Sequence, residues 1–360
     1  MLGVLAAILS LLSGQSLELR QAISPSAAPA AGTELTLRQL VGQRMVFAYD
    51  GLTPPPQLRS RIRRGEAAGV IVFARNVRSG AQLRATVRDL QAIPRPRALR
   101  APLIVMTDQE SGPVRRIAGP PAVAAAQTGG VDAARADGRA TARTLRGAGV
   151  NMDLAPVADV GRPGAALVRE RRTHGRAPRT VSRLVRAFAA GLRAGRVRAT
   201  AKHYPGLGAA RVNTDAAPQR IDLPLDELRR VDEPPFVSLI DAGVDAVMLA
   251  TAVYPALDER PAALSPPWVQ GELRGRLGFD GVTISDDLQT PAVSAYGSIA
   301  RRAVLAARAG IDVPLFVGEY RSGALAAAGL LRAARRGQLP RAELEAAARR
   351  VLALRARLAR

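Results

Sequence analysis

The chain has 360 residues, enough for one large domain or two smaller ones. Hydrophobic residues make up 48% of it and charged residues 23%, a composition that supports a packed core and excludes a disordered protein. There is no cysteine, and His174 and His203 are the only histidines. This excludes disulfides, a cysteine nucleophile, and zinc sites built from thiolates or several imidazoles, and nothing in the sequence calls for a metal or an organic cofactor.

The chain is strongly basic, since 52 Lys and Arg against 30 Asp and Glu give a formal net charge of +22. Such a charge is typical of nucleic-acid binding. However, the arginines are scattered over all the predicted helices, and an aromatic content of 3% leaves few platforms on which bases would stack. We therefore expect no specific nucleic-acid partner.

The N-terminal residues form the only membrane-like segment of the sequence. The run from Met1 to Leu12 is largely apolar, is too short to span a bilayer, and resembles the apolar part of a secretory signal, although it lacks a basic start. A buried or interfacial helix is the alternative. Residues 24–32 are rich in Pro and Ala and predict a flexible linker. We expect residues 1–23 to be an export or membrane-anchoring segment, and residues 33–360 to fold outside the cytoplasmic membrane.

Short β-branched runs alternate with longer amphipathic segments from Thr33 onward, a pattern that predicts βαβ units and a parallel sheet. The predicted strands are Met45–Tyr49, Gly69–Ala74, Leu103–Thr107, Val150–Ala155, Arg198–His203, Ala246–Ala250, Gly281–Ser285 and Ile311–Val317. Eight such strands separated by helices predict a single α/β domain with the (β/α)8 TIM barrel fold. The last strand is the weakest because it contains Pro314. A doubly wound open sheet is the alternative, but no Gly-x-Gly-x-x-Gly motif opens the first unit.

Polar residues gather where three of these strands end. The third strand continues into Asp108, the fifth contains Lys202 and His203, and the seventh continues into Asp286 and Asp287. Lys202 is the sole lysine of the chain. The C-terminal strand ends of a barrel converge on one active site, so we expect these side chains to share a cavity. Helix capping would explain any one of them, but it explains charge at three separate strand ends less well.

Five segments carry a family resemblance. In chain order they are Thr107-Asp-Gln-Glu-Ser-Gly-Pro-Val-Arg-Arg116, Ala155-Pro-Val-Ala-Asp-Val160, Lys202-His-Tyr-Pro-Gly-Leu-Gly208, Leu277-Gly-Phe-Asp-Gly-Val-Thr-Ile-Ser-Asp-Asp-Leu288 and Ala309-Gly-Ile-Asp312. Together they resemble glycoside hydrolase family 3, in particular its single-domain bacterial β-N-acetylhexosaminidases, from about Leu35 to Arg360. The resemblance implies a TIM barrel that hydrolyses β-linked sugars with retention, has a carbohydrate substrate and uses no cofactor.

The resemblance also implies roles for individual residues. Asp286 stands at the position of the family nucleophile, which a retaining glycosidase pairs with an acid/base about 5 Å away. Asp287 would point the other way on an extended strand, so we expect a structural role for it. The residues expected to bind the hydroxyl groups of the sugar ring are Asp108, Arg116, Arg171, Lys202 and His203.

The loop after the fifth predicted strand departs from the family pattern. The resembled hexosaminidases have an Asp-Ser-His triplet there, whose His is the acid/base, whereas this chain has Asn213, Thr214 and Asp215. We expect Asp215 to be the acid/base if burial or a neighbouring carboxylate raises its pKa. Support of the loop by a short hydrogen bond is the alternative role. Further departures are Leu207 and Thr251, where the family often has His, and Pro113, where it has Arg.

The sequence therefore predicts a retaining β-glycosidase, in particular a β-N-acetylhexosaminidase that acts on cell-wall-derived or other β-linked sugars in peptidoglycan turnover. A β-glucosidase-like specificity and a non-catalytic sugar-binding barrel are the alternatives. Asp286 favours an enzyme, because a protein that only binds sugar needs no nucleophile. The basic surface makes an anionic cell-wall polymer a candidate partner.

Overall fold

The structure is a computed structural model that describes residues 34–359. Leu35–Arg360 form one compact unit, which contains all the helices and strands discussed below. The predicted segment 1–23 and the predicted linker 24–32 lie outside the described residues.

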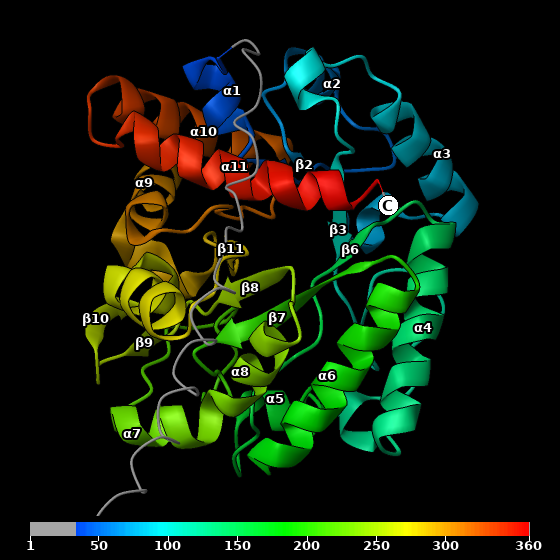
Figure 1. Cartoon of the computed structure of the whole chain (residues 1–360), viewed down its shortest axis with the longest axis vertical. Coiled ribbons are helices and arrows are strands. Elements are labelled where there is room, and N and C mark those ends of the chain that lie inside the picture. Colours follow the sequence, from blue (N-terminus) through cyan, green and yellow to red (C-terminus); the bar gives the residue numbers. More distant parts are fainter. Residues whose placement is uncertain (1–33, 360) are drawn as a thin grey trace, which may run out of the picture. The chain divides into compact units, whose positions relative to one another are not determined.

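A sheet of seven strands forms the centre of this unit (Figure 1). Its strands, in spatial order, are β1 (Val46–Phe47), β2 (Gly69–Ile71), β3 (Ile104–Thr107), β6 (Met152–Asp153), β7 (Arg198–Tyr204), β8 (Ala246–Leu249) and β11 (Val282–Ser285). All neighbouring strands are parallel, and their order in the sheet follows their order in the chain. A doubly wound sheet would reverse direction at a switch point, so this order excludes that alternative.

The eighth predicted strand is irregular. Val313 forms a parallel bridge with Ile284, and the Leu288 N–H donates to the carbonyl oxygen of Leu315 at 3.0 Å. Pro314 interrupts the segment and has no N–H to donate. Within residues 34–359 no strand pairing joins this segment to β1. Instead the buried Arg44, next to β1, donates from Nε to the carbonyl oxygen of Asp312 at 3.2 Å.

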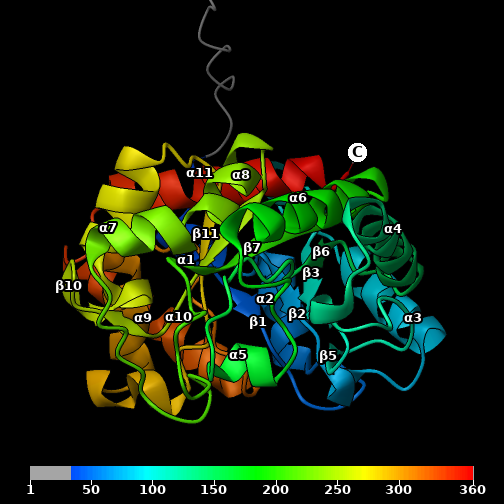
Figure 2. The same ribbon diagram turned by 90° about the horizontal axis from the view of Figure 1, so that it is seen from below.

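Helices surround the strands (Figure 2). The α-helices are α1 (Leu37–Gly42), α2 (Pro56–Arg64), α3 (Gly80–Gln91), α4 (Val131–Gly147), α5 (Ala166–Arg169), α6 (Pro178–Ala194), α7 (Leu225–Glu227), α8 (Pro234–Asp241), α9 (Ile299–Ala309), α10 (Tyr320–Arg335) and α11 (Arg341–Arg357). Leu228–Asp232 and Pro267–Arg276 are π-helical. In α6 the buried residues Val181, Val185, Phe188 and Leu192 recur every three or four positions, which gives the helix one apolar face.

Glycines let α4 and α6 pack closely. A Cβ atom added to Gly138 would lie 2.2 Å from the carbonyl oxygen of Phe188, and one added to Gly191 would lie 2.4 Å from that of Arg135. Both atoms belong to backbone that side-chain rotation cannot move. The crossing therefore requires glycine at these positions.

Apolar side chains fill the space inside the sheet. Ile104 and Met106 of β3 belong to an interior cluster, whereas Val105 between them belongs to the cluster under the helices. This alternation is the one expected for a barrel strand. Val351 and Leu354 of α11, drawn in red in Figure 1, join the interior cluster. Arg355 of the same helix donates to the carbonyl oxygen of Pro102, just before β3, so α11 covers the N-terminal ends of the strands.

Two antiparallel hairpins follow parallel strands at the opposite end. β4 (Gln109–Ser111) pairs with β5 (Val114–Arg115) after β3, and β9 (Val253–Tyr254) pairs with β10 (Asp258–Pro261) after β8. The first hairpin places several polar residues beside the C-terminal strand ends.

Candidate active site

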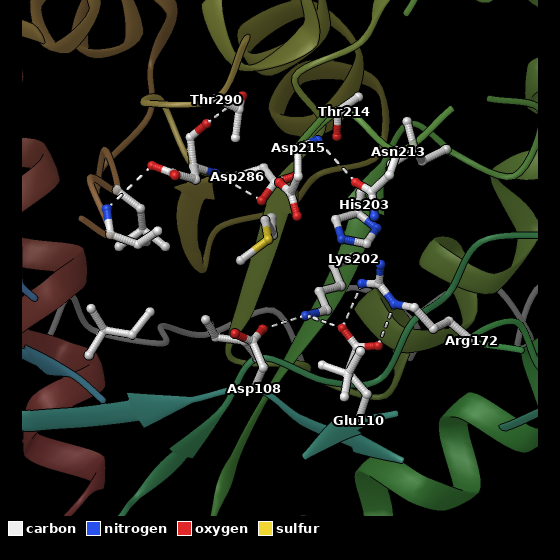
Figure 3. Close-up of a pocket in the computed structure, with 18 of the residues that line it drawn as sticks. Asp108, Glu110, Arg172, Lys202, His203, Asn213, Thr214, Asp215, Asp286 and Thr290 are labelled. Carbon is white, nitrogen blue, oxygen red and sulfur yellow. Dashed lines mark hydrogen bonds and ion pairs between the residues drawn. The ribbon is translucent and has the colours of Figure 1, made fainter. Parts of the chain in front are cut away.

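A cavity of about 530 Å³ lies at the C-terminal ends of the parallel strands (Figure 3). The three predicted strand ends converge there, and six of the seven predicted site residues line the cavity. These six are Asp108, Arg116, Lys202, His203, Asp215 and Asp286.

Lys202 lies at the centre of a buried ionic network. Its Nζ is 2.7 Å from Asp108 Oδ1 and 2.6 Å from Glu110 Oε1, and its side chain is 2% exposed. Arg172 binds the other face of Glu110 through two hydrogen bonds of 2.8 Å. Burial alone lowers the pKa of Lys202, but the carboxylates of Asp108 and Glu110 outweigh it and hold the pKa above its ordinary value. The network therefore stays charged and presents fixed donors and acceptors to a ligand.

Glu110 is ionised because two cations, Lys202 and Arg172, contact its carboxylate. Burial raises the pKa of this carboxyl, but Arg172 and Lys202 outweigh burial and hold it well below its ordinary value. A buried carboxylate is stable only when cations and hydrogen bonds satisfy it, as they do here. Glu110 thus links Lys202 and Arg172, a role that was not predicted from the sequence.

His203 is held by a buried carboxylate. Its Nδ1 lies 2.8 Å from Asp159 Oδ2, and the same carboxylate accepts the Leu207 N–H at 2.6 Å. Asp159 is fully buried. With Nδ1 bound in this way, Nε2 is the nitrogen available to a ligand in the cavity.

The β4–β5 hairpin positions Arg116. The buried Gln109 side chain accepts the backbone N–H groups of Arg116 at 3.0 Å and Ile117 at 3.1 Å, which fixes the end of the hairpin. The Arg116 guanidinium lies 3.8 Å from Asp108 and over the ring of Phe73, 5.6 Å from its centroid. One cation and one aromatic face thereby line the same side of the cavity.

Of the predicted site residues, Arg171 is the one that does not line the cavity, and its neighbour Arg172 lines it instead. Arg171 follows the short helix α5, is exposed, and has a left-handed backbone with a φ of 58°. In this turn the Arg171 N–H donates to the Val168 carbonyl oxygen at 3.0 Å, and the Arg172 N–H donates to the Leu167 carbonyl oxygen at 2.9 Å. This helix-ending turn sets the direction of both side chains.

Asp286 follows β11 directly. Its backbone N–H donates to the Leu249 carbonyl oxygen of β8 at 2.9 Å, and its carboxylate accepts the Asp287 N–H at 2.8 Å. The Asp287 carboxyl accepts the N–H groups of Gln289 at 3.0 Å and Val317 at 3.3 Å. Burial, together with the charge of Asp286, raises the pKa of Asp287 to about 7.

Asp215 lies beside Asp286 in the cavity, on the loop after β7 (Figure 3). The residue as a whole is exposed, and it lines the cavity. Removal of this carboxyl from water raises its pKa, and the charge of Asp286 raises it further. Both effects shift the pKa of Asp215 upward, as the acid/base role requires.

The site thus contains two neighbouring carboxyl groups in different environments, beside a set of fixed cations and hydrogen-bonding groups. Such a pair can divide the tasks of nucleophile and proton donor in glycoside hydrolysis. Within residues 34–359, no group of three or more His, Asp or Glu residues is arranged to hold a metal ion.

The parallel sheet with its strands in chain order is a TIM-barrel-like α/β fold, and neighbouring carboxyl groups line the cavity at its strand ends. Residues 33–354 match the model of the glycosyl hydrolase family 3 N terminal domain. The chain therefore belongs to glycosyl hydrolase family 3, and the resemblance seen in its motifs is confirmed.

Relatives and solved structures agree with this assignment. An uncharacterized secreted glycosyl hydrolase of Arthroderma benhamiae is 38% identical over 343 residues, which cover 92% of this chain and 96% of the relative. A beta-hexosaminidase of Xanthomonas oryzae is 36% identical over 282 residues, 75% of this chain and 82% of that protein.

Two solved structures share the fold. A family 3 β-N-acetylglucosaminidase from Paenibacillus sp. superimposes with a TM-score of 0.84 at 32% identity, covering 91% of this chain and 63% of that longer chain. A β-N-acetylhexosaminidase from Beutenbergia cavernae gives a TM-score of 0.82 at 34% identity, covering 90% of this chain and 99% of that one.

Proposed function

We propose that the protein is a retaining β-glycosidase with β-N-acetylhexosaminidase activity. The observation that carries this proposal is the placement of Asp215 beside Asp286, with the pKa of Asp215 raised. Asp286 attacks the anomeric carbon while Asp215 protonates the leaving oxygen. The resulting glycosyl–enzyme bond is then hydrolysed by a water molecule that Asp215 deprotonates.

The other cavity residues bind the sugar ring. Asp108 accepts hydrogen bonds from hydroxyl groups, and the donors are Arg116, Arg172, Lys202 and His203. We also assign the segment Ile311–Val317 the place of the eighth strand of a (β/α)8 barrel, because Leu315 and Val317 line the cavity. The hexosaminidase names of the relatives support an N-acetylated amino sugar as substrate, and cell-wall fragments are the proposed source of that sugar.

Replacement of Asp286 tests the nucleophile. Asp286→Asn keeps the shape and removes the charge that stabilises the transition state, so we expect a loss of about 10²- to 10³-fold in kcat on an aryl N-acetyl-β-glucosaminide. A slow fluorinated glycoside should label the peptide that contains Asp286, as detected by mass spectrometry. Activity of the variant within a few-fold of the parent would contradict the assignment. The same assay with an aryl β-glucoside tests the β-glucosidase-like specificity.

Replacement of Asp215 tests the acid/base. Asp215→Ala should lose about 10²-fold or more on a phenyl glycoside, which needs protonation, and much less on a dinitrophenyl glycoside, which does not. Azide should partly restore turnover of the activated substrate by attacking the glycosyl–enzyme. Equal losses on both substrates without an azide response would favour the loop-support role, and a parent protein that binds sugar without hydrolysis would favour a non-catalytic barrel.

We further propose that the protein acts outside the cytoplasmic membrane and attaches to anionic wall polymers. The secreted relative supports the location. No helix of the described residues is long and apolar enough to cross a membrane. The outer faces of α4 and α6 carry seven exposed arginines that have no ion pair or side-chain hydrogen bond in the described part of the chain: Arg135, Arg139, Arg143, Arg146, Arg179, Arg183 and Arg186. Cell fractionation tests the location, and salt-sensitive cosedimentation with a polyanionic wall polymer tests attachment.

A further inference from the structure

We infer that Glu170 is a positioning residue for Asp215, and that it acts through the side chain of Asn213. The inference rests on the proposed function, because it takes Asp215 as the acid/base. It assigns a role to two residues that the family resemblance leaves without one in this chain.

The loop after β6 and the loop after β7 run side by side toward Asp215. The Arg162 N–H donates to the Gly208 carbonyl oxygen at 3.0 Å, and the Ala166 N–H donates to that of Ala210 at 2.8 Å. These two hydrogen bonds join backbone to backbone. The close approach requires glycine at 208, since a Cβ atom there would lie 1.9 Å from the Val160 carbonyl oxygen.

The contact nearest to Asp215 in this series joins two side chains. Asn213 Nδ2 donates to Glu170 Oε1 at 3.1 Å and to Oε2 at 3.3 Å. The Oδ1 atom of the same amide accepts the Asp215 N–H at 3.0 Å. If the amide flipped, its oxygen would face the Glu170 carboxylate and its NH2 group would face an N–H donor, so both hydrogen bonds would be lost. Glu170 therefore fixes the amide, and the amide fixes the backbone of Asp215.

Glu170 is itself fixed to the floor of the cavity. Arg172 Nη1 lies 3.1 Å from Glu170 Oε2, and the rest of the Arg172 guanidinium binds Glu110. Glu110 in turn binds Lys202, which binds Asp108. Charged contacts thus lead from the residues proposed to bind the sugar to Glu170, and the neutral Asn213 amide continues the series to the backbone of Asp215, as the dashed lines in Figure 3 show in part.

This attachment matters because the end of the loop is otherwise exposed. Asp215, Ala216 and Pro218 are all exposed, so little apolar packing holds them. A general acid must lie within hydrogen-bond distance of the leaving oxygen, and a displacement of about 1 Å can cost about 10²-fold in rate. We therefore expect loss of the Glu170–Asn213 contact to impair proton donation more than sugar binding.

The variant Asn213→Asp breaks the contact selectively. It keeps an oxygen that accepts the Asp215 N–H, but it sets one carboxylate against another at Glu170. We expect kcat/KM on a phenyl N-acetyl-β-glucosaminide to fall by about 10- to 100-fold, and kcat/KM on the dinitrophenyl glycoside to fall by at most a few-fold. Glu170→Ala, which removes the partner without adding a charge, should show the same dependence on the leaving group.

The double variant Glu170→Gln, Asn213→Asp restores the contact with its polarity reversed. The Gln amide donates to the new carboxylate while its oxygen still accepts from Arg172, so activity on the phenyl glycoside should return to within a few-fold of the parent. Asp222→Asn is the matched control: Asp222 is an exposed carboxylate paired with Arg220 at 2.7 Å outside the cavity, and its loss should change neither substrate's kinetics.

The outcomes separate this inference from the proposed function. Parent-like activity of Asn213→Asp on the phenyl glycoside, an equal loss on both glycosides, or no recovery in the double variant would overturn the positioning role. In those cases the nucleophile and acid/base assignments would stand if Asp286→Asn and Asp215→Ala behave as proposed. If those two variants keep full activity, the proposed function fails instead.

Discussion

The carboxyl groups of the cavity differ in protonation because each has different neighbours. Glu110 contacts two cations, which hold its pKa well below the ordinary value. Burial raises the pKa of Asp215, and the charge of the neighbouring Asp286 raises it further. Glu110 therefore stays ionised to lower pH than Asp215 does, and a raised pKa is what a general acid requires.

The pH dependence of activity should follow from this difference. The proposed mechanism needs Asp215 protonated, and the pKa of Asp215 is raised, so its acid form persists to higher pH than it would in a free aspartate. We expect kcat/KM to fall as the pH rises through the raised pKa of Asp215. In Asp215→Ala this fall on the alkaline side should disappear when a dinitrophenyl glycoside is the substrate. An unchanged alkaline fall would assign it to another group.

Asp287 should make stability depend on pH. Its pKa is raised to about 7 by burial and by Asp286, so the folded state binds a proton more tightly than the unfolded state does. This contribution is present at low pH and is lost as the pH rises toward 7. Between pH 5 and pH 8 we expect the free energy of unfolding to fall by about 1 to 2 kcal/mol more in the parent than in Asp287→Asn, measured by urea denaturation. Equal slopes in both proteins would contradict the raised pKa.

The sequence predicted the charged residues at the strand ends better than the residues that hold them. Asp108 and Asp286 directly follow β3 and β11, and Lys202 lies near the end of β7, so the predicted strand ends place them. Arg172 was missed in favour of Arg171 because the turn after α5 decides which arginine faces inward, and a left-handed arginine cannot be read from spacing. The contact of Glu170 could not be predicted from the residues around it, because its partner Asn213 lies 43 residues further along the chain.

Among the secondary-structure elements, α4 and α6 depend on close contact between glycines. Gly138→Ala would press a methyl group against the Phe188 carbonyl oxygen, 2.2 Å from the added Cβ, so one helix would have to move. We expect a loss of about 2 to 3 kcal/mol in the free energy of unfolding. Gly147→Ala in the same helix is the control: a Cβ there meets nothing within 4 Å, and it should be neutral or stabilising by up to about 1 kcal/mol. Equal effects of the two substitutions would rule out the contact as the cause.

The predicted strands illustrate how far periodicity defines elements. Seven of the eight predicted runs contain a strand of the parallel sheet, because a β-branched run between two amphipathic helices has few other structures open to it. The hairpins β4–β5 and β9–β10 were not predicted, since they are short, carry polar residues and have no alternating apolar pattern. Their pairing depends on the strands that precede them.

At the scale of the whole molecule, side chains connect the last segment of the sheet region to the first. Arg44 is buried and donates to the Asp312 carbonyl oxygen, while Asp312 Oδ1 and Oδ2 bind Arg350 at 2.7 Å and Arg274 at 2.8 Å. Burial lowers the pKa of Arg44 to about 10, so its charge persists at neutral pH. Arg44 thus joins the last segment to the first, where no strand pairing does so within residues 34–359.

Arg44→Met tests this connection. The variant keeps the apolar stem and leaves buried carbonyl groups without a donor, so we expect a loss of about 3 kcal/mol in the free energy of unfolding. Because Leu315 and Val317 line the cavity, KM should rise as well. Arg38→Met removes an exposed arginine of α1 and should change stability by less than about 0.5 kcal/mol. A similarly small effect of Arg44→Met would show that packing alone holds the segment in place.

The hydrogen bonds between the loops after β6 and β7 also limit how this enzyme can diverge. A chimaera that takes only residues 205–220 from a relative would leave Arg162, Ala166 and Glu170 facing foreign partners. A chimaera that takes residues 156–220 together would keep these three residues with their own partners in the loop after β7. The two loops therefore have to be exchanged together if their hydrogen bonds are to be kept. We expect recombination among relatives to change the substrate range most readily when both loops are exchanged at once.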